Sequence, residues 1–386
     1  MKPHHILVFV LLLNLLTHAG FAQYIYELDK TTRFDRMGAE EGLSTGYAQC
    51  IHQDKYGFIW IGTQLGLNLY DGYEVNVFNA DPKNPRALIN DWIYKILEEP
   101  DGTMWFCTQL GISKYNRANQ TFTNYIPEVF DNYSDLPSSG NALMMIQDGH
   151  YFWIRNEQDL LRFDKKTETF LSFGKDTVNP EKGVFGSNLT GGFMDRAGVF
   201  WVCSGEFRDD YALSRFDKET ETFVHFRNDP SDPESFVGKP VRSMMEDREG
   251  TIWVATLGGG LIEITDKEQG KFKQYAHDEN DPNSLLNDDL LGVYEDSAGR
   301  IWTFGVNGFS RYNKKTAQFT NIEIPHRTYD STESNWIRGI TEGKSGELWL
   351  SSVEGVFRFD PATRVLTHYL FDRANENSLS HNVIIQ

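Results

Sequence analysis

One tryptophan-centred motif recurs along the chain at a nearly constant spacing. Most copies follow the pattern D-x-x-G-x-x-W, and the copy at residues 54–71 is D-K-Y-G-F-I-W-I-G-T-Q-L-G-L-N-L-Y-D. Seven tryptophans anchor the copies: Trp60, Trp105, Trp153, Trp201, Trp253, Trp302 and Trp349. Consecutive anchors lie 45 to 52 residues apart. A period of about 40 to 50 residues is typical of units that stack on one another to bury a shared core.

Each repeat contains four segments of strand character. In the first repeat they are residues 48–52, 58–63, 67–70 and 74–78. The second segment has isoleucines on one face and Trp60 on the other, so both of its faces must be covered. An aromatic share of 14% also suits stacked sheets better than helices. We predict an all-β fold, a seven-bladed β-propeller of four-stranded antiparallel blades.

The Asp and Gly before each tryptophan also suggest a functional interpretation. They resemble the Asp-box of sialidases, but that motif has the register D-x-G-x-x-W, and a sialidase also needs an arginine cluster and a tyrosine nucleophile. An Asp side chain can bond to the backbone of its own turn, and glycine accepts the positive φ that a tight hairpin needs. We therefore interpret these residues as turn formers.

The N-terminal segment, residues 1–22, has the features of a secretory signal. Lys2 precedes an apolar run at residues 6–16, and small residues follow at Gly20 and Ala22. The alternative is an uncleaved anchor, but a membrane span needs about 20 apolar residues and this run is shorter. We expect cleavage before Gln23 and export to the periplasm, with no membrane contact by the segment that remains.

A formal net charge of −18 limits the partners of the chain. Nucleic acids and anionic membranes need a positive field, so both are disfavoured. Neutral sugars are compatible with this charge. An acidic glycan would need a local group of Arg and Lys residues.

The sequence offers little for metal or redox chemistry. Its three cysteines, Cys50, Cys107 and Cys203, are too few and odd in number for a disulfide framework, so we expect buried free thiols. The histidines lack metal-ligand spacing, and the acidic loop at residues 278–283 lacks the alternating ligands and glycine of a calcium loop. We expect no metal site, no cofactor and no catalytic residue.

With these motifs in hand, the chain resembles the two-component regulator propeller repeat family. The family pattern resembles I-x-x-D-x-x-G-x-I-W-I-G-T-x-x-G-L-x-x-Y-D, followed by F-x-x-Y and an N-S-L-S loop. Matching loops begin at Asn84, Asp232, Asp281 and Asn375, and the segment from Phe34 resembles the start of a first propeller. The resemblance covers nearly everything after residue 30.

The resemblance implies a periplasmic sensor region of a hybrid two-component histidine kinase. In that family two seven-bladed propellers usually precede an immunoglobulin-like domain, a membrane helix and a kinase. Here we expect a signal peptide at residues 1–22 and one propeller sensor domain at residues 23–386. The last residues begin a further repeat, so the chain resembles a first propeller cut from a longer sensor or a truncated reading frame, without kinase activity of its own.

A propeller must close its sheet edges, usually by combining both termini in one blade. We predict that residues 32–37 form the outer strand of the last blade and pair with its third strand near residues 356–359. The alternative is that residues 365–370 provide that outer strand.

Propellers bind ligands over the central channel, so the starts of the first strands are candidate site positions. In the first repeat these are the positions that Tyr47 and Gln49 hold before Trp60. The equivalent positions of the other repeats carry flat aromatic rings beside amides, an acid and guanidinium groups, as a sugar site requires. The predicted ligand-binding residues are Tyr47, Trp92, Tyr94, Asn141, Asn188, Arg242, Asp289, Trp336 and Arg338. The alternative is that the tryptophans wedge between blades and that the arginines form internal ion pairs.

Three functional hypotheses follow. The first is a sensory module that detects an oligosaccharide and signals to the histidine kinase portion of the same parent protein, with a homodimer left open. The second is a propeller enzyme, a polysaccharide lyase or a glycosidase. Hydrolysis needs converging carboxylates, and the predicted ring has only Asp289. The third is a passive protein-interaction scaffold.

Overall fold

The computed structural model describes residues 24–127, 145–155, 160–205, 210–324 and 335–384. It consists of seven sheets of at least four strands, with antiparallel pairing between consecutive strands. The predicted fold class, an all-β seven-bladed β-propeller of four-stranded antiparallel blades, is confirmed. The predicted signal peptide lies outside the described residues.

The chain divides into two compact units, which are described separately. Arg33–Pro240 forms a four-blade unit. Its strands are β2 (Ala48–Gln53), β3 (Ile59–Thr63), β4 (Leu67–Tyr70) and β5 (Val75–Phe78); β6 (Ile93–Glu98), β7 (Met104–Thr108), β8 (Gly111–Asn116) and β9 (Thr121–Tyr125); β10 (Met145–Asp148), β11 (Tyr151–Arg155), β12 (Leu160–Asp164) and β13 (Thr169–Ser172); and β14 (Asn188–Met194), β15 (Phe200–Gly205), β16 (Tyr211–Asp217) and β17 (Thr222–Phe226). Two short 3-10 turns, Ala39–Glu41 and Pro180–Lys182, belong to the same unit.

The other unit has three blades and combines Val241–Ile385 with the N-terminal segment up to Thr32. Its strands are β18 (Val241–Glu246), β19 (Ile252–Thr256), β20 (Leu261–Asp266) and β21 (Lys271–Tyr275); β22 (Leu290–Glu295), β23 (Ile301–Gly305), β24 (Gly308–Asn313) and β25 (Gln318–Glu323); and β26 (Ile337–Glu342), β27 (Leu348–Ser352), β28 (Gly355–Asp360) and β29 (Val365–Tyr369), with β1 (Ile25–Asp29) added to the last blade. All four strands predicted for the first repeat are present, to within one residue at each end.

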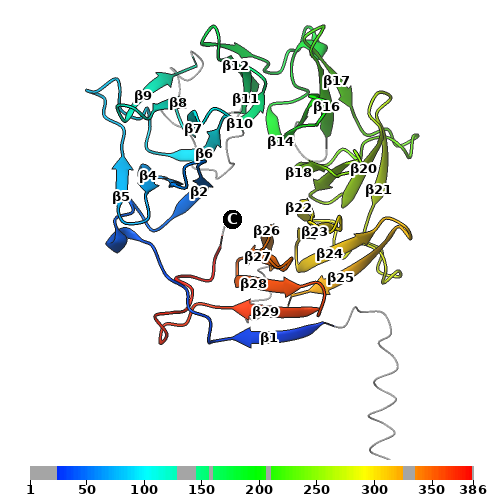
Figure 1. The fold of residues 1–386 in the computed structure, drawn as a ribbon. Coiled ribbons are helices and arrows are strands. Elements are labelled where there is room, and N and C mark those ends of the chain that lie inside the picture. Colours follow the sequence, from blue (N-terminus) through cyan, green and yellow to red (C-terminus); the bar gives the residue numbers. More distant parts are fainter. Residues whose placement is uncertain (1–23, 128–144, 156–159, 206–209, 325–334, 385–386) are drawn as a thin grey trace, which may run out of the picture. The chain divides into compact units, whose positions relative to one another are not determined.

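Within each unit the first strands of neighbouring blades contact one another. β2 contacts β6 and β10 contacts β14 in the four-blade unit, while β22 contacts both β18 and β26 in the three-blade unit (Figure 1). The apolar core lies between consecutive blades. Trp60, for example, packs against Phe106 and Tyr115 of the next blade, with ring centroids 5.1 and 5.0 Å apart. A blade therefore buries its faces only against its neighbours.

The turn before each anchoring tryptophan is built on a carboxylate. Asp54 accepts backbone N–H bonds from Tyr56 and Phe58, each at 3.0 Å, and Gly57 has a φ of +92°. The interpretation of these acids as turn formers is confirmed. The acids also accept the indole N–H of every anchor: Trp60 to Asp54 at 3.0 Å, Trp105 to Glu99 at 2.7 Å, Trp153 to Asp148 at 3.2 Å, Trp201 to Asp195 at 3.3 Å, Trp253 to Asp247 at 2.8 Å, Trp302 to Asp296 at 2.8 Å and Trp349 to Glu347 at 3.3 Å.

Several of these acids, which are buried or half-buried, are neutralised by a cation from the following blade. The cation comes directly after the third strand of that blade, where Asn or Asp is followed by Lys or Arg. The pairs are Arg117 with Asp54 at 2.7 Å, Lys165 with Glu99, Lys218 with Asp148 at 2.5 Å and Lys314 with Asp247 at 2.7 Å. An acid that is fully buried would otherwise carry an uncompensated charge.

The long loops that resemble the N-S-L-S motif are structural. In three of them a serine closes the loop on an aspartate six residues earlier, accepting its N–H and donating to its carbonyl. The residue after each serine is apolar and buried: Phe236, Leu285 and Leu379. Each loop thus places one apolar side chain in the core.

The prediction for the outer strand of the last blade is wrong. β29 occupies that place and pairs antiparallel with β28, as in the alternative, whereas residues 32–37 form no strand. β1 adds a fifth strand by pairing parallel to β29, with Ile25 opposite Val365 and Asp29 opposite Tyr369 (Figure 1). Asp29 then accepts bonds from Thr31 and Thr32, which form an Asx turn and end the strand.

Removal of one buried acid tests the carboxylate anchor. Asp247→Ala takes away the partner of Trp253, of Lys314 and of two turn amides. We expect a loss of about 2 to 4 kcal/mol, below the full range for a fully buried pair because Lys314 is 28% exposed. Calorimetry should show a fall in Tm of several °C. Glu249→Gln removes only the exposed second partner of Lys314 and should be nearly neutral; equal effects of the two variants would contradict the assignment.

The same carboxylate predicts a pH dependence. Burial opposes ionisation of Asp247, but hydrogen bonds from Lys314 and Trp253 outweigh it and hold the pKa of Asp247 below its ordinary value. Because the folded pKa is depressed, its stabilisation is present above about pH 4 and is lost as the pH falls through the folded pKa. The Tm of the wild type, followed by circular dichroism, should fall more steeply on acidification than that of Asp247→Asn. Parallel curves would refute this.

Candidate functional site

The first strand of six blades carries a β-bulge near its start, at the second residue of five strands and the third residue of β14. The ladder with the second strand shifts register there, so that one residue is left without a partner in the ladder. The bulged residues are Gln49, Tyr94, Thr190, Arg242, Leu291 and Arg338. Each precedes its anchoring tryptophan by the same interval as Gln49 precedes Trp60. A bulge redirects a side chain and is frequent beside binding sites.

Trp92 and Tyr94 are the predicted site residues that the structure brings into direct contact in the four-blade unit. Trp92 immediately precedes β6 and Tyr94 is the bulged residue of that strand. Their rings stack with centroids 5.6 Å apart and an interplanar angle of 16°. Both side chains are half-buried, and the Trp92 indole N–H has no hydrogen-bond partner among the described residues. The two stacked rings form a flat aromatic platform, whereas the indole N–H itself is buried.

The other predicted residues of this unit are more separate. Tyr47, directly before β2, is 43% exposed. Asn188 begins β14 and donates its amide N–H to the hydroxyl of Tyr211 at 2.6 Å, so it is held by a residue that was not among the predicted ones. Asn141 lies outside the described residues.

In the three-blade unit the predicted residues lie at the matching starts of three blades. Arg242 and Arg338 are bulged and exposed. Asp289 and Trp336 immediately precede β22 and β26 and are half-buried, each tied by an isolated bridge to the preceding blade, Asp289 to Leu257 and Trp336 to Val306. The backbone at these positions is therefore fixed by a neighbouring blade.

Beside Trp336 the side chain of Asn335 is 1% exposed, and neither its amide nitrogen nor its oxygen has a partner among the described residues. A buried amide without partners is costly, which marks this strand entrance as unusual. The connection between β15 and β16, at residues 205–211, is described only in part. Its Asp210 forms an exposed ion pair with Arg227 at 3.0 Å, and Arg208 and Asp209 lie outside the described residues.

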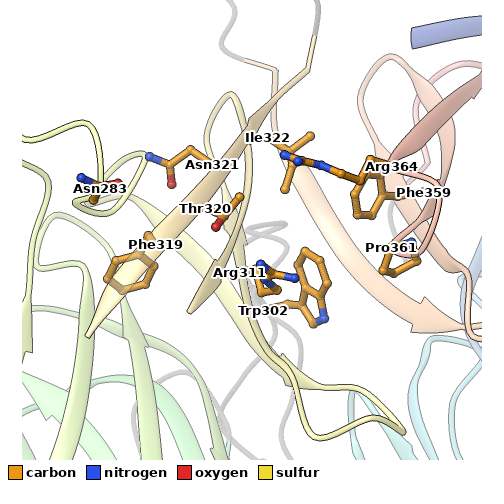
Figure 2. Close-up of a pocket in the computed structure, with 10 residues that line it drawn as sticks. All are labelled: Asn283, Trp302, Arg311, Phe319, Thr320, Asn321, Ile322, Phe359, Pro361 and Arg364. Carbon is orange, nitrogen blue, oxygen red and sulfur yellow. The ribbon is translucent and has the colours of Figure 1, made fainter. Parts of the chain in front are cut away.

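A cavity of about 450 Å³ lies in the three-blade unit between β25 and the turn that joins β28 to β29 (Figure 2). Two arginines, Arg311 and Arg364, line it together with Trp302, Phe319, Phe359 and Thr320. None of these six residues is among the predicted ligand-binding positions. The sequence signal is weak, because each arginine stands out only when the repeats are aligned on their structure.

The structure offers no evident metal site or reactive thiol among the residues that it describes. No group of three or more His, Cys, Asp or Glu side chains there is placed to hold a metal ion. All three cysteines are buried and none forms a disulfide, as predicted. Burial raises the pKa of both Cys50 and Cys107 to about 12, so their thiolates are scarce at neutral pH.

The comparisons with known proteins agree with the repeat pattern. The family model described as two component regulator propeller matches residues 42–64 and 235–258. These segments contain β2 with β3 and β18 with β19, including the bulges at Gln49 and Arg242. The two matched segments are two-component regulator propeller repeats. Repeats of this kind support the interpretation of the fold as a sensory propeller.

Solved structures of similar fold were also found. The extracellular domains of two hybrid two component systems from B. thetaiotaomicron, BT3049 and BT4673, are 18% and 20% identical, with TM-scores of 0.38 and 0.37. The alignments cover 91% and 88% of this chain but only 62% and 53% of those chains. The Dos1 propeller has a TM-score of 0.52 at 12% identity over 84% of this chain and 80% of its own, and this likeness concerns the fold alone. No curated protein matches the sequence.

Within the described residues, no helix combines the length and the apolar character that crossing a membrane requires.

Thiol chemistry gives a test of the core. We expect Cys50, Cys107 and Cys203 to resist an alkylating reagent at pH 8 in the folded chain, because all three are buried, and to react together once guanidinium unfolds it. Mass spectrometry of the intact chain counts the modified thiols. Rapid modification of Cys107, which is 1% exposed, in the folded chain would contradict the structure.

Proposed function

We propose that the chain is an extracytoplasmic sensory propeller of a two-component regulatory system, that it detects an oligosaccharide, and that it signals to a histidine kinase in the same parent protein. The observation that supports the ligand class best is the stacked pair of Trp92 and Tyr94 at the start of β6. A pyranose ring presents an apolar face that packs on a flat aromatic surface, and its hydroxyls need polar partners beside that surface.

Bulged residues of other blades are also part of the proposed binding site. Arg242 and Arg338 present exposed guanidinium groups at the positions that Tyr94 occupies in its own blade. Guanidinium groups carry several fixed donors and suit sugar hydroxyls. The remaining predicted residues, Tyr47, Asn141, Asn188, Asp289 and Trp336, complete the proposed set of ligand-binding positions.

Signalling follows from coupling rather than from chemistry within these residues. A ligand that binds one conformation of the sensor more tightly shifts the population toward it, and the shift equals the difference in affinity. The chain spans only 53% to 62% of the B. thetaiotaomicron extracellular domains that it resembles. The kinase, the periplasmic location and any dimer are therefore part of the proposal, as is the absence of catalytic activity.

A glycan array followed by titration calorimetry tests the ligand class. Loss of the aromatic platform in Trp92→Ala should cost about 1 to 2 kcal/mol of binding free energy, a roughly 5- to 30-fold increase in Kd. Tyr73→Ala is the matched control, because Tyr73 lies in the same unit, is 96% exposed and precedes β5 at the far end of its blade from β2. Its Kd should equal that of the wild type.

Three outcomes would overturn the proposal. They are the absence of any glycan ligand, unchanged binding by a folded Trp92→Ala variant, and turnover of a polysaccharide by the purified chain. An unaltered Tm of Trp92→Ala, measured by circular dichroism, shows that the variant has folded.

A further inference from the structure

A cation recurs at one position of the third strand, directly opposite the anchoring tryptophan. Lys114 pairs with Trp105, Arg162 with Trp153 and Arg311 with Trp302 in the strand register. The position is thus equivalent in blades of both units. Its side chain lies toward the turn between the third and fourth strands of the next blade, as the Arg162 contact shows.

The turn between the third and fourth strands also contains a position that can be compared between blades. Four residues after the Asp or Asn that ends the third strand, one residue takes a left-handed φ: Glu168 at +58°, Glu221 at +53°, Ala317 at +56° and Arg364 at +61°. In the four-blade unit an acid at this turn position binds the cation of the third strand of the preceding blade: Glu221 pairs with Arg162 at 2.6 Å. One blade earlier the two positions hold Lys114 and Glu168.

In the last two blades the acid is replaced by a second cation. Arg311 of β24 and Arg364 of the β28–β29 turn line the same 450 Å³ cavity. Figure 2 shows Arg364 reaching from its turn toward β25, with Arg311 beside Trp302. Neither guanidinium forms a hydrogen bond or ion pair with a described residue. Two like charges that line one cavity repel each other unless an anion lies between them.

A neighbouring change alters the wall of this cavity. The residue after Asp360 is Pro361, where other blades have the lysine or arginine that pairs with the buried acid of the preceding blade. Proline cannot supply that charge, and Asp296 is instead neutralised by Arg300 of its own blade. The equivalent position thus carries no charge in the last blade, and Pro361 is part of the cavity wall.

We propose that this cavity binds the carboxylate of an acidic sugar, a uronic acid unit of an oligosaccharide. Guanidinium forks match a planar carboxylate, and such charge-assisted bonds are about twice as strong as neutral ones. The apolar wall of Phe319 and Phe359 and the hydroxyl of Thr320 suit a sugar ring better than a bare inorganic anion. The sugar class rests on the proposed function, whereas the anion site does not.

The site is also a local exception to the charge of the chain. A net charge of −18 repels anions over the surface as a whole. Two guanidinium groups that have no partner among the described residues line one cavity and reverse that sign locally, which is what an acidic glycan requires.

Titration calorimetry with tetragalacturonate, and with cellotetraose as the neutral probe, tests the site. We expect tetragalacturonate to bind the wild type at least ten-fold more tightly than cellotetraose, and more weakly as salt is added. Arg364→Gln should weaken the acidic probe by at least five-fold. Arg373→Gln removes one exposed charge from a different loop of the same unit and should have no effect.

Arg364→Glu is the decisive variant, because it recreates the Arg162–Glu221 arrangement in the last blades. The new glutamate should pair with Arg311, abolish tetragalacturonate binding and leave the Tm equal to or above that of the wild type. A lost affinity with an intact Tm cannot be attributed to misfolding. Undiminished binding by this variant overturns the site.

The outcomes separate this inference from the proposed function. Binding of cellotetraose that depends on Trp92, with no Arg364-dependent binding of tetragalacturonate, overturns the carboxylate site and leaves the sensory proposal intact. Tetragalacturonate binding that Trp92→Ala abolishes and Arg364→Glu spares also overturns it. Binding that depends on Arg364 and not on Trp92 supports the carboxylate site and contradicts the inner-strand platform.

Discussion

The hydrogen bond from each anchoring indole to a buried or half-buried acid is the interaction on which the rest of the structure depends. A buried tryptophan removes about 150 to 250 Å² from water, roughly 4 to 6 kcal/mol at the usual coefficient, but its N–H then needs an acceptor. An aspartate or glutamate supplies it in all seven blades. In the first blade Asp54 also forms the preceding turn and attracts Arg117 from the next blade. A single carboxylate thus stabilises the turn, satisfies the core tryptophan and binds a cation of the next blade.

Much of the fold could be predicted from the sequence because each blade repeats the same local solution. Alternating apolar residues and D-x-x-G turns locate strands β2 to β5 to within one residue. The closing blade could not be predicted so well. Residues 32–37 and 365–370 both have strand character, and the choice between them depends on whether β1 finds a free edge at β29. That contact joins segments far apart in the sequence, which local patterns do not reveal.

The sequence predicted where the candidate residues lie along the strands, but not which of their side chains contact one another. Counting back from the tryptophans located the bulged residues Tyr94, Arg242 and Arg338, because the hairpin between the first two strands has constant length. The stacking of Trp92 on Tyr94 could not be inferred, since it depends on how the bulge turns the strand. Arg311 and Arg364 were missed because a surface arginine is common, and its meaning appears only against the equivalent ion pair of Arg162 and Glu221.

In a repeat protein the equivalent positions of different blades can be compared, so a residue that differs from its counterparts can be recognised. The acid anchors vary least, because loss of one leaves a buried indole and a buried cation without partners. Where the last blades depart, two changes occur together: Pro361 replaces the cation and Arg364 replaces the acid. The first change is compensated internally by Arg300. The second is not compensated by any described residue, and an acidic ligand would supply the missing negative charge.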